Sequence, residues 1–186
     1  MTGSAAEAMV EQITRIRAAD LHDLCDAADL AIRDGGGFGW VEPPPRDVME
    51  RYWRGVLIVP ERRLFVGRLD GVVAGSAQLV CPPRNNEAQS FAASLTTSFV
   101  APWARGHGLA RKLTLAVEQE ARVLGFRVLN LDVRETQTAA IALYESLGFR
   151  HWGRHPCYAV VHGRTISGHY FYKDLDTTEL PPENPT

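Results

Sequence analysis

The junction that decides the fold reads Val100-Ala101-Pro102-Trp103-Ala104-Arg105-Gly106-His107-Gly108-Leu109-Ala110. It runs from the end of a predicted strand into the start of an amphipathic helix, with two glycines at the turn. A helix N-terminus exposes unpaired N–H groups and carries a partial positive charge, so it suits a phosphate group. Arg105, Arg111 and Lys112 gather here, although cations oppose the helix dipole at this end. The junction predicts a pyrophosphate-binding turn, with a plain turn and a solvated basic rim as the alternative.

Regular elements extend from this junction toward the C-terminus. Residues 95–100 are predicted as the strand before the turn, and residues 109–124 as a helix with one apolar face. Residues 127–133 alternate apolar and polar side chains, which is typical of a strand. The remaining predicted elements are a short helix at residues 136–147 and a final strand pair at residues 151–161 and 167–175.

The N-terminal half has a similar mixture of patterns. Strands are predicted at residues 13–17, 64–69 and 72–80, and helices at residues 18–33 and 47–57. The pair Asp70-Gly71 separates two strand-like runs, which predicts a β-hairpin. Glycines at residues 35–37 end the first helix. The order of elements favours an α/β fold with one mixed sheet and helices on its faces.

Composition limits the class of protein. The 186 residues are enough for one domain, predicted at residues 1–175, and 45% of them are apolar. The tail at residues 176–186 is acidic and proline-rich, and it is predicted to be disordered. A net charge of −2 gives no general attraction to nucleic acid or to anionic membranes. With no membrane-length apolar run, no signal peptide and no metal-binding cysteine pattern, we expect a cytoplasmic, metal-free protein with buried, reduced thiols.

Two short motifs resemble the GNAT superfamily of N-acetyltransferases. The run Val100-x-Pro-x-x-Arg105-Gly-x-Gly-Leu-Ala110 is similar to the acyl-CoA-binding motif of that family. The run Ala140-Ile141-x-Leu143-Tyr144-x-x-Leu147-Gly148-Phe149 resembles its second characteristic helix. One helix and one strand separate the motifs, as in the family, and the similarity extends over about residues 13–175. The resemblance implies a mixed, mostly antiparallel sheet with helices on both faces and one splayed strand pair.

The GNAT resemblance also implies acetyl-CoA as the donor and a role for each part of its site. The strand that ends in Phe99 and Val100 would pair with the pantetheine arm, and the strand splay would open the cleft. Tyr144 would contact the thioester and protonate the departing thiolate. The other residues implied to contact acetyl-CoA are Arg105, Gly106, His107, Gly108, Leu109, Ala110, Gln137 and Ala140.

The sequence departs from the family pattern at the position of the catalytic general base. Many relatives carry a glutamate on the strand before the glycine turn, but residues 94–100 contain no carboxylate. Glu87 is a candidate base that acts through water, with a solvated loop residue as the alternative. His155 is a second candidate, with a packed or solvated histidine as the alternative. Gln137 stands where an asparagine is often seen and is one methylene longer, so its cofactor contact is predicted to differ.

A closer resemblance, to tabtoxin-resistance acetyltransferases, favours a small acceptor such as an amino-acid-like compound or an antibiotic. It rests on Gly37, Gly39, Pro43, Tyr52, Trp53, Asn85, His155, Pro156, Tyr158, Ala159, Tyr170, Tyr172, Lys173 and Leu175. The loop at residues 35–45, with Phe38, Trp40 and Glu42, is predicted to cover that acceptor, with a plain packing loop as the alternative. The predicted function is direct transfer of an acetyl group from acetyl-CoA to a primary amine of a small molecule. The alternatives are an acyl-CoA-binding sensor without turnover and a protein N-terminal or lysine acetyltransferase; a homodimer would be in keeping with the family.

Overall fold

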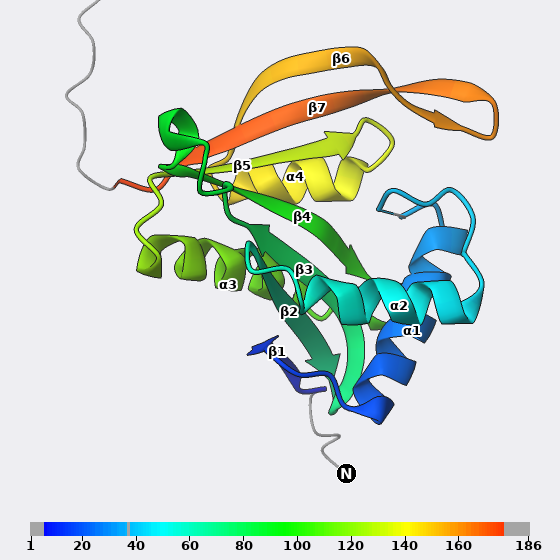
Figure 1. The fold of residues 1–186 in the computed structure, drawn as a ribbon. Coiled ribbons are helices and arrows are strands. Elements are labelled where there is room, and N and C mark those ends of the chain that lie inside the picture. The colour runs from blue at the N-terminus through cyan, green and yellow to red at the C-terminus, as the bar shows by residue number, and fades with distance from the viewer. Residues whose placement is uncertain (1–5, 37, 177–186) are drawn as a thin grey trace, which may run out of the picture.

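The computed structural model describes residues 6–36 and 38–176, which form one sheet with helices on both faces (Figure 1). Across the sheet, the strands of this part of the chain follow the order β1-β2-β3-β4-β5-β7-β6. The strands are β1 (Ala8–Ile13), β2 (Arg62–Leu69), β3 (Val72–Val80), β4 (Ala92–Val100), β5 (Val128–Arg134), β6 (Arg150–Val161) and β7 (Arg164–Asp174). The helices are α1 (Ala18–Arg33), α2 (Arg46–Val56), α3 (Leu109–Val123) and α4 (Thr138–Ser146), with 3-10 turns η1 (Glu87–Gln89) and η2 (Pro102–Ala104). The predicted mixed α/β fold is confirmed.

The sheet opens between β4 and β5. Neighbouring strands are antiparallel everywhere except at this pair, which runs parallel. The parallel strands pair only where residues 92–94 lie beside residues 128–130. Beyond Ser94, β4 continues to Val100 without a β5 partner among the described residues, and the two strands diverge (Figure 1). The predicted splayed pair is therefore confirmed, and it leaves one edge of β4 open.

A bulge in β4 reverses the face of the sheet to which the side chains of its second half point. Against β3, β4 contains one extra residue between Thr96 and Phe99. Thr97 has a φ of +52°, a conformation that is rare for a β-branched residue. An inserted residue inverts the alternation of side chains between the two faces of a sheet. Leu95 accordingly packs in the core beneath α3, whereas Phe99 packs in the core beneath α1.

Separate cores hold the helices on the two faces. On one face, Leu113 of α3 packs with Leu129 of β5 and with residues of α4. On the other face, α1 and α2 meet the sheet through a second cluster that includes Trp53, whose side chain has no exposed surface. Full burial of one such large apolar side chain contributes about 1.5–3 kcal/mol. The two cores fix the sheet between the helices, so that the opening between β4 and β5 has rigid walls.

Local sequence accounts for the hairpin of β2 and β3. Asp70 and Gly71 have φ values of +50° and +84°, as a two-residue hairpin turn requires, and the predicted hairpin is confirmed. Further along β3, a Cβ on Gly75 would overlap the carbonyl oxygen of Phe99. Glycine thus lets the β3 backbone lie against β4 beside the bulge.

Some predicted boundaries are wrong. The first strand is β1 at Ala8–Ile13, because it is these residues that pair with β2, whereas residues 14–17 lead into α1. The last strand begins at Arg164, because the turn at His162-Gly163 is tight and both residues have positive φ.

The expectation of buried thiols is correct for Cys25 and wrong for Cys157, which is exposed on β6. Asp176 is the first residue of the predicted disordered tail, and its carboxylate pairs with Arg127 at 2.5 Å. The rest of that tail lies outside the described residues. In the part of the chain that the structure describes, no helix is both long and apolar enough to cross a membrane.

Candidate active site

A glycine turn connects β4 to α3 and presents an open concave surface. Gly106 and Gly108 have φ values of +80° and +75°, which glycine adopts without steric cost. A Cβ on either glycine would meet no atom within 4 Å, so the space in front of the turn is open. The first N–H groups of α3, from Leu109 onward, lack partners within the helix and are directed to this end. The turn can therefore hold a phosphate group through main-chain N–H groups.

A cavity of about 490 Å³, the turn cavity, extends from this turn to the start of α4. The residues predicted to bind acetyl-CoA that line it are Phe99, Val100, Arg105, Gly106, Gly108, Leu109, Ala110, Gln137, Ala140 and Tyr144. His107 is not among its lining residues; it is exposed, and its Nδ1 lies 3.0 Å from the Arg105 carbonyl oxygen. Residues 98–100 form a wall of the cavity at the open edge of β4. An unpaired strand edge can accept an extended ligand with amide groups as an added strand.

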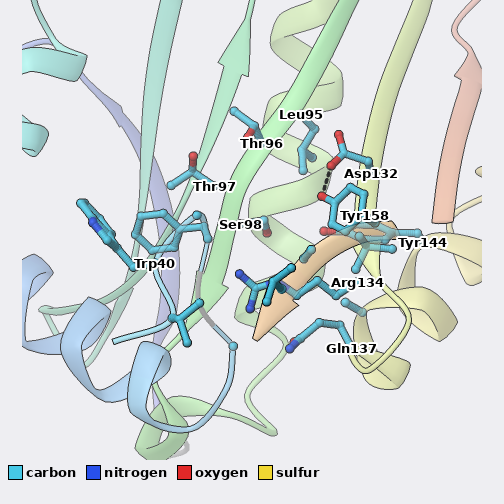
Figure 2. Close-up of a pocket in the computed structure, with 18 of the residues that line it drawn as sticks. Trp40, Leu95, Thr96, Thr97, Ser98, Asp132, Arg134, Gln137, Tyr144 and Tyr158 are labelled. Atoms are coloured by element: carbon cyan, nitrogen blue, oxygen red, sulfur yellow. Dashed lines mark hydrogen bonds between the residues drawn. The ribbon is translucent and has the colours of Figure 1, made fainter. Parts of the chain in front are cut away.

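Figure 2 shows a second cavity of about 740 Å³, the aromatic cavity, which adjoins the turn cavity. The two share Gly36, Ser98, Gln137, Ala140 and Tyr144. Phe38, Trp40 and Tyr52 form much of its aromatic lining. Phe38 stacks on Phe99 with 4.9 Å between ring centroids, and the Trp40 and Tyr52 rings meet edge-on at 5.0 Å. The loop after α1 thus contributes directly to the wall of this cavity.

Tyr144 of α4 lines both cavities and so lies where they meet; Figure 2 shows it in the aromatic cavity. Its side chain is buried, and this burial raises the pKa of the phenol above its ordinary value of 10.0. A side-chain hydrogen bond with Ser98 lowers that pKa by a smaller amount. The phenol is therefore protonated at neutral pH, and it can donate a proton to a group held between the cavities.

Asp132 of β5 is the carboxylate that lines the aromatic cavity in the described part of the chain. The hydroxyl of Tyr158 donates a hydrogen bond to it, drawn as a dashed line in Figure 2. Burial raises the pKa of Tyr158, and the bond to Asp132 raises it further, well above its ordinary range. The hydroxyl of Tyr158 therefore stays protonated and remains a donor, which orients the Asp132 carboxylate.

A bulge in β6 and a glycine in β7 position Tyr158. His155 pairs with Gly168 and Ala159 pairs with Ile166, so β6 has two more residues than β7 between these pairs. The Tyr158 ring lies on Gly168, where a Cβ would overlap the ring atoms. Tyr158 consequently passes over β7 and reaches Asp132 on β5.

Residues 24–149 match the profile of the acetyltransferase (GNAT) family. The chain belongs to the GNAT family of acetyltransferases. An uncharacterized N-acetyltransferase of Azospirillum brasilense, encoded in the hisH-hisA intergenic region, is 77% identical over 128 residues, which are 69% of this chain and 76% of that protein. The structure of an N-acetyltransferase from Staphylococcus aureus Mu50 matches with a TM-score of 0.77 and 21% identity, over 91% of this chain and 99% of that chain. The structure of a GNAT phosphinothricin acetyltransferase from Sinorhizobium meliloti, in complex with AcCoA, matches with a TM-score of 0.73 and 24% identity. The match covers 95% of this chain and 94% of that chain.

The GNAT assignment makes the chain an N-acetyltransferase with acetyl-CoA as its acetyl donor. The closer resemblance to the tabtoxin-resistance branch stays a prediction.

In this GNAT chain, the segment after α1 is tied to both walls of the turn cavity. The Arg105 guanidinium pairs with Asp34 at 2.5 Å, and Gln137 donates from Nε2 to the Gly35 carbonyl oxygen at 2.6 Å. Lys112, predicted as part of a basic rim, donates instead to the Ala8 carbonyl oxygen at 2.6 Å. The basic residues near the turn therefore hold neighbouring segments in place as well as adding positive charge.

The sequence-based candidates for the base lie elsewhere. Glu87 is exposed on η1, and His155 is exposed on β6, where its Nδ1 accepts a bond from the Cys157 N–H at 3.0 Å. Neither side chain lines the turn cavity or the aromatic cavity. Glu42, predicted as part of the loop over the acceptor, has its Oε1 atom 3.7 Å from His162 Nδ1 and also lies outside both linings. Sequence reasoning gives no role to Asp132, whose one signal is its place on the polar side of the strand beside the splay.

Proposed function

We propose that this GNAT N-acetyltransferase acetylates a primary amine of a small molecule, such as an amino-acid-like compound. The observation that carries the proposal is the position of Tyr144 between the turn cavity and the aromatic cavity, with Asp132 facing the latter. A cavity of about 740 Å³ lies within the range of small-molecule sites, and its mixture of aromatic and polar walls is typical of them. The cavity lining thus favours a small acceptor over the protein N-terminus or lysine of the alternative.

The turn cavity is assigned to acetyl-CoA, and its residues fit that group. The open space before Gly106 and Gly108 suits the pyrophosphate, and the free edge of β4 suits the amides of the pantetheine arm. Acetyl-CoA supplies an activated acetyl thioester, and CoA leaves as a thiol. Arg105, Gln137 and Ala140 belong to the same wall, whereas His107 is proposed as a spacer in the turn.

Asp132 and Tyr144 have complementary roles in the proposal, as base and acid. An amine with a pKa of about 10.4 needs roughly 4–5 kcal/mol for deprotonation at neutral pH. Asp132 accepts that proton, either directly or through water, while Tyr158 holds its carboxylate. Tyr144 donates its phenolic proton to the leaving sulfur. The ammonium group thus loses two protons in becoming an amide: Asp132 takes the first, and the second, released when the amide forms, offsets the proton that Tyr144 gives to the thiolate.

A thiol-release assay with acetyl-CoA and a panel of amines tests the proposal. We expect CoA release that depends on the amine, with the N-acetyl product identified by mass spectrometry. In Asp132→Asn, kcat/KM should fall about 100-fold or more, as for loss of a general base. Glu87→Gln is the matched control, because it also removes one carboxylate but lies outside both cavities, and its activity should be unchanged.

The outcomes separate the proposal from its alternatives. Acetylation of peptide N-termini or lysines, with no small amine accepted, would contradict the small-molecule acceptor. Tight acetyl-CoA binding without release of thiol with any amine or peptide would favour the sensor. Loss of activity in Glu87→Gln but not in Asp132→Asn would move the base back to the loop before β4.

A further inference from the structure

The aromatic cavity carries an unbalanced positive charge. Its charged lining residues among those described are Arg62, Asp132 and Arg134. Arg62 donates from Nη1 to the Gln78 side chain at 2.7 Å, and Asp132 accepts from Tyr158. Arg134 forms no side-chain hydrogen bond or ion pair with any described residue. Arg134, a half-buried residue whose guanidinium has free donors, therefore lines a cavity in which an acceptor is expected to lie.

Arg134 lies on the same wall as the proposed base (Figure 2). It is two residues from Asp132 on β5, so both project from one face of the strand, about 6–7 Å apart along it. On β7, Arg134 pairs with Gly168, the residue beneath the Tyr158 ring. The charge of Arg134 also reaches the Tyr158 hydroxyl, where it lowers the pKa against the larger effects of burial and of Asp132.

This charge arrangement is unfavourable for a purely cationic acceptor. An amine enters mainly as an ammonium ion, and the two guanidiniums outnumber the one carboxylate that faces it. A carboxylate on the acceptor would remove that imbalance and would occupy the donors of Arg134, since a guanidinium binds a carboxylate through two parallel hydrogen bonds. The spacing of Asp132 and Arg134 suits an amine and a carboxylate on neighbouring atoms of one small molecule.

We infer that Arg134 binds a carboxylate of the acceptor, and that the acceptor is consequently an amino acid or a similar amino carboxylate. The inference rests on the proposed function and names its substrate class. Arg134 lines the aromatic cavity and is absent from the lining of the turn cavity, so the phosphates assigned to the glycine turn do not account for it. It is thus a specificity-determining residue, distinct from the acetyl-CoA contacts.

Matched acceptor pairs test the inference. Free L-amino acids are compared with their carboxamides at saturating acetyl-CoA in the wild type, Arg134→Gln and Arg154→Gln. The last is the control, because it removes the same charge from β6, where Arg154 pairs with Glu135 and does not line the cavity. The carboxamides have the less basic amine, so intrinsic reactivity favours them, and a preference for the acids must come from binding.

We expect the wild type and Arg154→Gln to prefer the acids by about 10- to 100-fold in kcat/KM, the range for hydrogen bonds to a charged group. Arg134→Gln should lose this preference while its Kd for acetyl-CoA stays the same. The inference would be overturned if the wild type had equal kcat/KM values for acids and carboxamides. It would also be overturned if Arg134→Gln lowered kcat/KM by the same factor for both.

A binding measurement keeps the inference separate from the proposed function. N-acetyl amino acids and N-acetyl carboxamides are titrated into CoA-loaded protein by calorimetry, which needs no turnover. If no amine is acetylated, the proposed function fails, yet selective binding of the N-acetyl amino acids, lost in Arg134→Gln, would still support the carboxylate site. Binding without selectivity would overturn the inference even if amines are acetylated.

Discussion

The turn cavity and the aromatic cavity differ in what forms them. Half of the residues that line the turn cavity belong to one continuous junction, from the open edge of β4 through the glycines into α3, and most of the others come from α4 and the two residues before it. The aromatic cavity is lined by residues that come from the loop after α1, from α2 and α4, and from β2, β4, β5 and β6. The difference teaches that a main-chain site is recorded in one local motif, whereas a side-chain site depends on how distant strands are aligned. It also predicts that single substitutions can change acceptor chemistry in the aromatic cavity without changing acetyl-CoA binding in the turn cavity, and the reverse.

The largest effect is expected where the cavities meet. Tyr144→Phe removes the phenolic proton and keeps the buried ring, so kcat should fall by about 100- to 10,000-fold, the range for a general acid. The Kd for acetyl-CoA should be unchanged, as measured by calorimetry. Tyr52→Phe is a useful control, because it removes a hydroxyl from a residue that lines the aromatic cavity but not the turn cavity.

Unchanged turnover in Tyr144→Phe would refute the acid role and reduce Tyr144 to a packing residue. A parallel loss of acetyl-CoA affinity would instead show that the hydroxyl belongs to the turn cavity.

The next effect should be confined to the aromatic cavity. In Gly168→Ala, the new Cβ overlaps the Tyr158 ring, so Tyr158 must move away from Asp132. We expect kcat/KM to fall about 10-fold or more and the free energy of unfolding to fall by roughly 1–3 kcal/mol, as for an overpacked site. Acetyl-CoA affinity should stay at the wild-type value.

A second substitution shows whether the clash is the cause. Tyr158→Ser removes the ring, so adding Gly168→Ala in that background should cost little further stability, as measured by urea unfolding. Equal destabilisation in both backgrounds would mean that Gly168 acts through β7 itself. Neither Tyr158→Ser nor the double variant should recover activity, because both lack the hydroxyl beside Asp132.

Sequence reasoning succeeded where structure follows from local spacing. The apolar spacing of α1 predicted its bounds, Ala18–Arg33, and Asp70-Gly71 predicted the hairpin. It failed at β1, an edge strand whose partly exposed residues give a weak alternation. The approach of Tyr158 to Asp132 could not be predicted, because it depends on extra residues in β6 and on the absence of a side chain at Gly168. Neither feature has a local pattern that points to the other strand.

A smaller effect concerns pH. Burial raises the pKa of Tyr144 above 10.0. The protonated phenol is lost only as the pH rises through this raised pKa. At saturating acetyl-CoA and acceptor, kcat should therefore show no falling limb up to about pH 10, after subtraction of spontaneous thioester hydrolysis. A falling limb centred near about pH 8 that disappears in Tyr144→Phe would contradict the raised pKa.

The smallest effect is expected at the rim of the turn cavity. The Arg105–Asp34 pair is half-exposed, and such pairs contribute about 0–1 kcal/mol. Asp34→Asn should change the Kd for acetyl-CoA by less than about 5-fold, with a smaller difference at high salt. A change of about 100-fold would mean that this pair, rather than the glycine turn, determines cofactor binding.

Thermal unfolding with acetyl-CoA tests the separation of the two cavities most directly. Ligand at about 100 times its Kd adds about 2.7 kcal/mol, a Tm rise of roughly 5–10 °C for a chain of this length. The wild type and Asp132→Asn should both show this rise. Gly108→Val should lose it, because valine disfavours the positive φ and its side chain fills the open space before the turn. A rise retained in Gly108→Val, or lost in Asp132→Asn, would contradict the assignment of acetyl-CoA to the main-chain site.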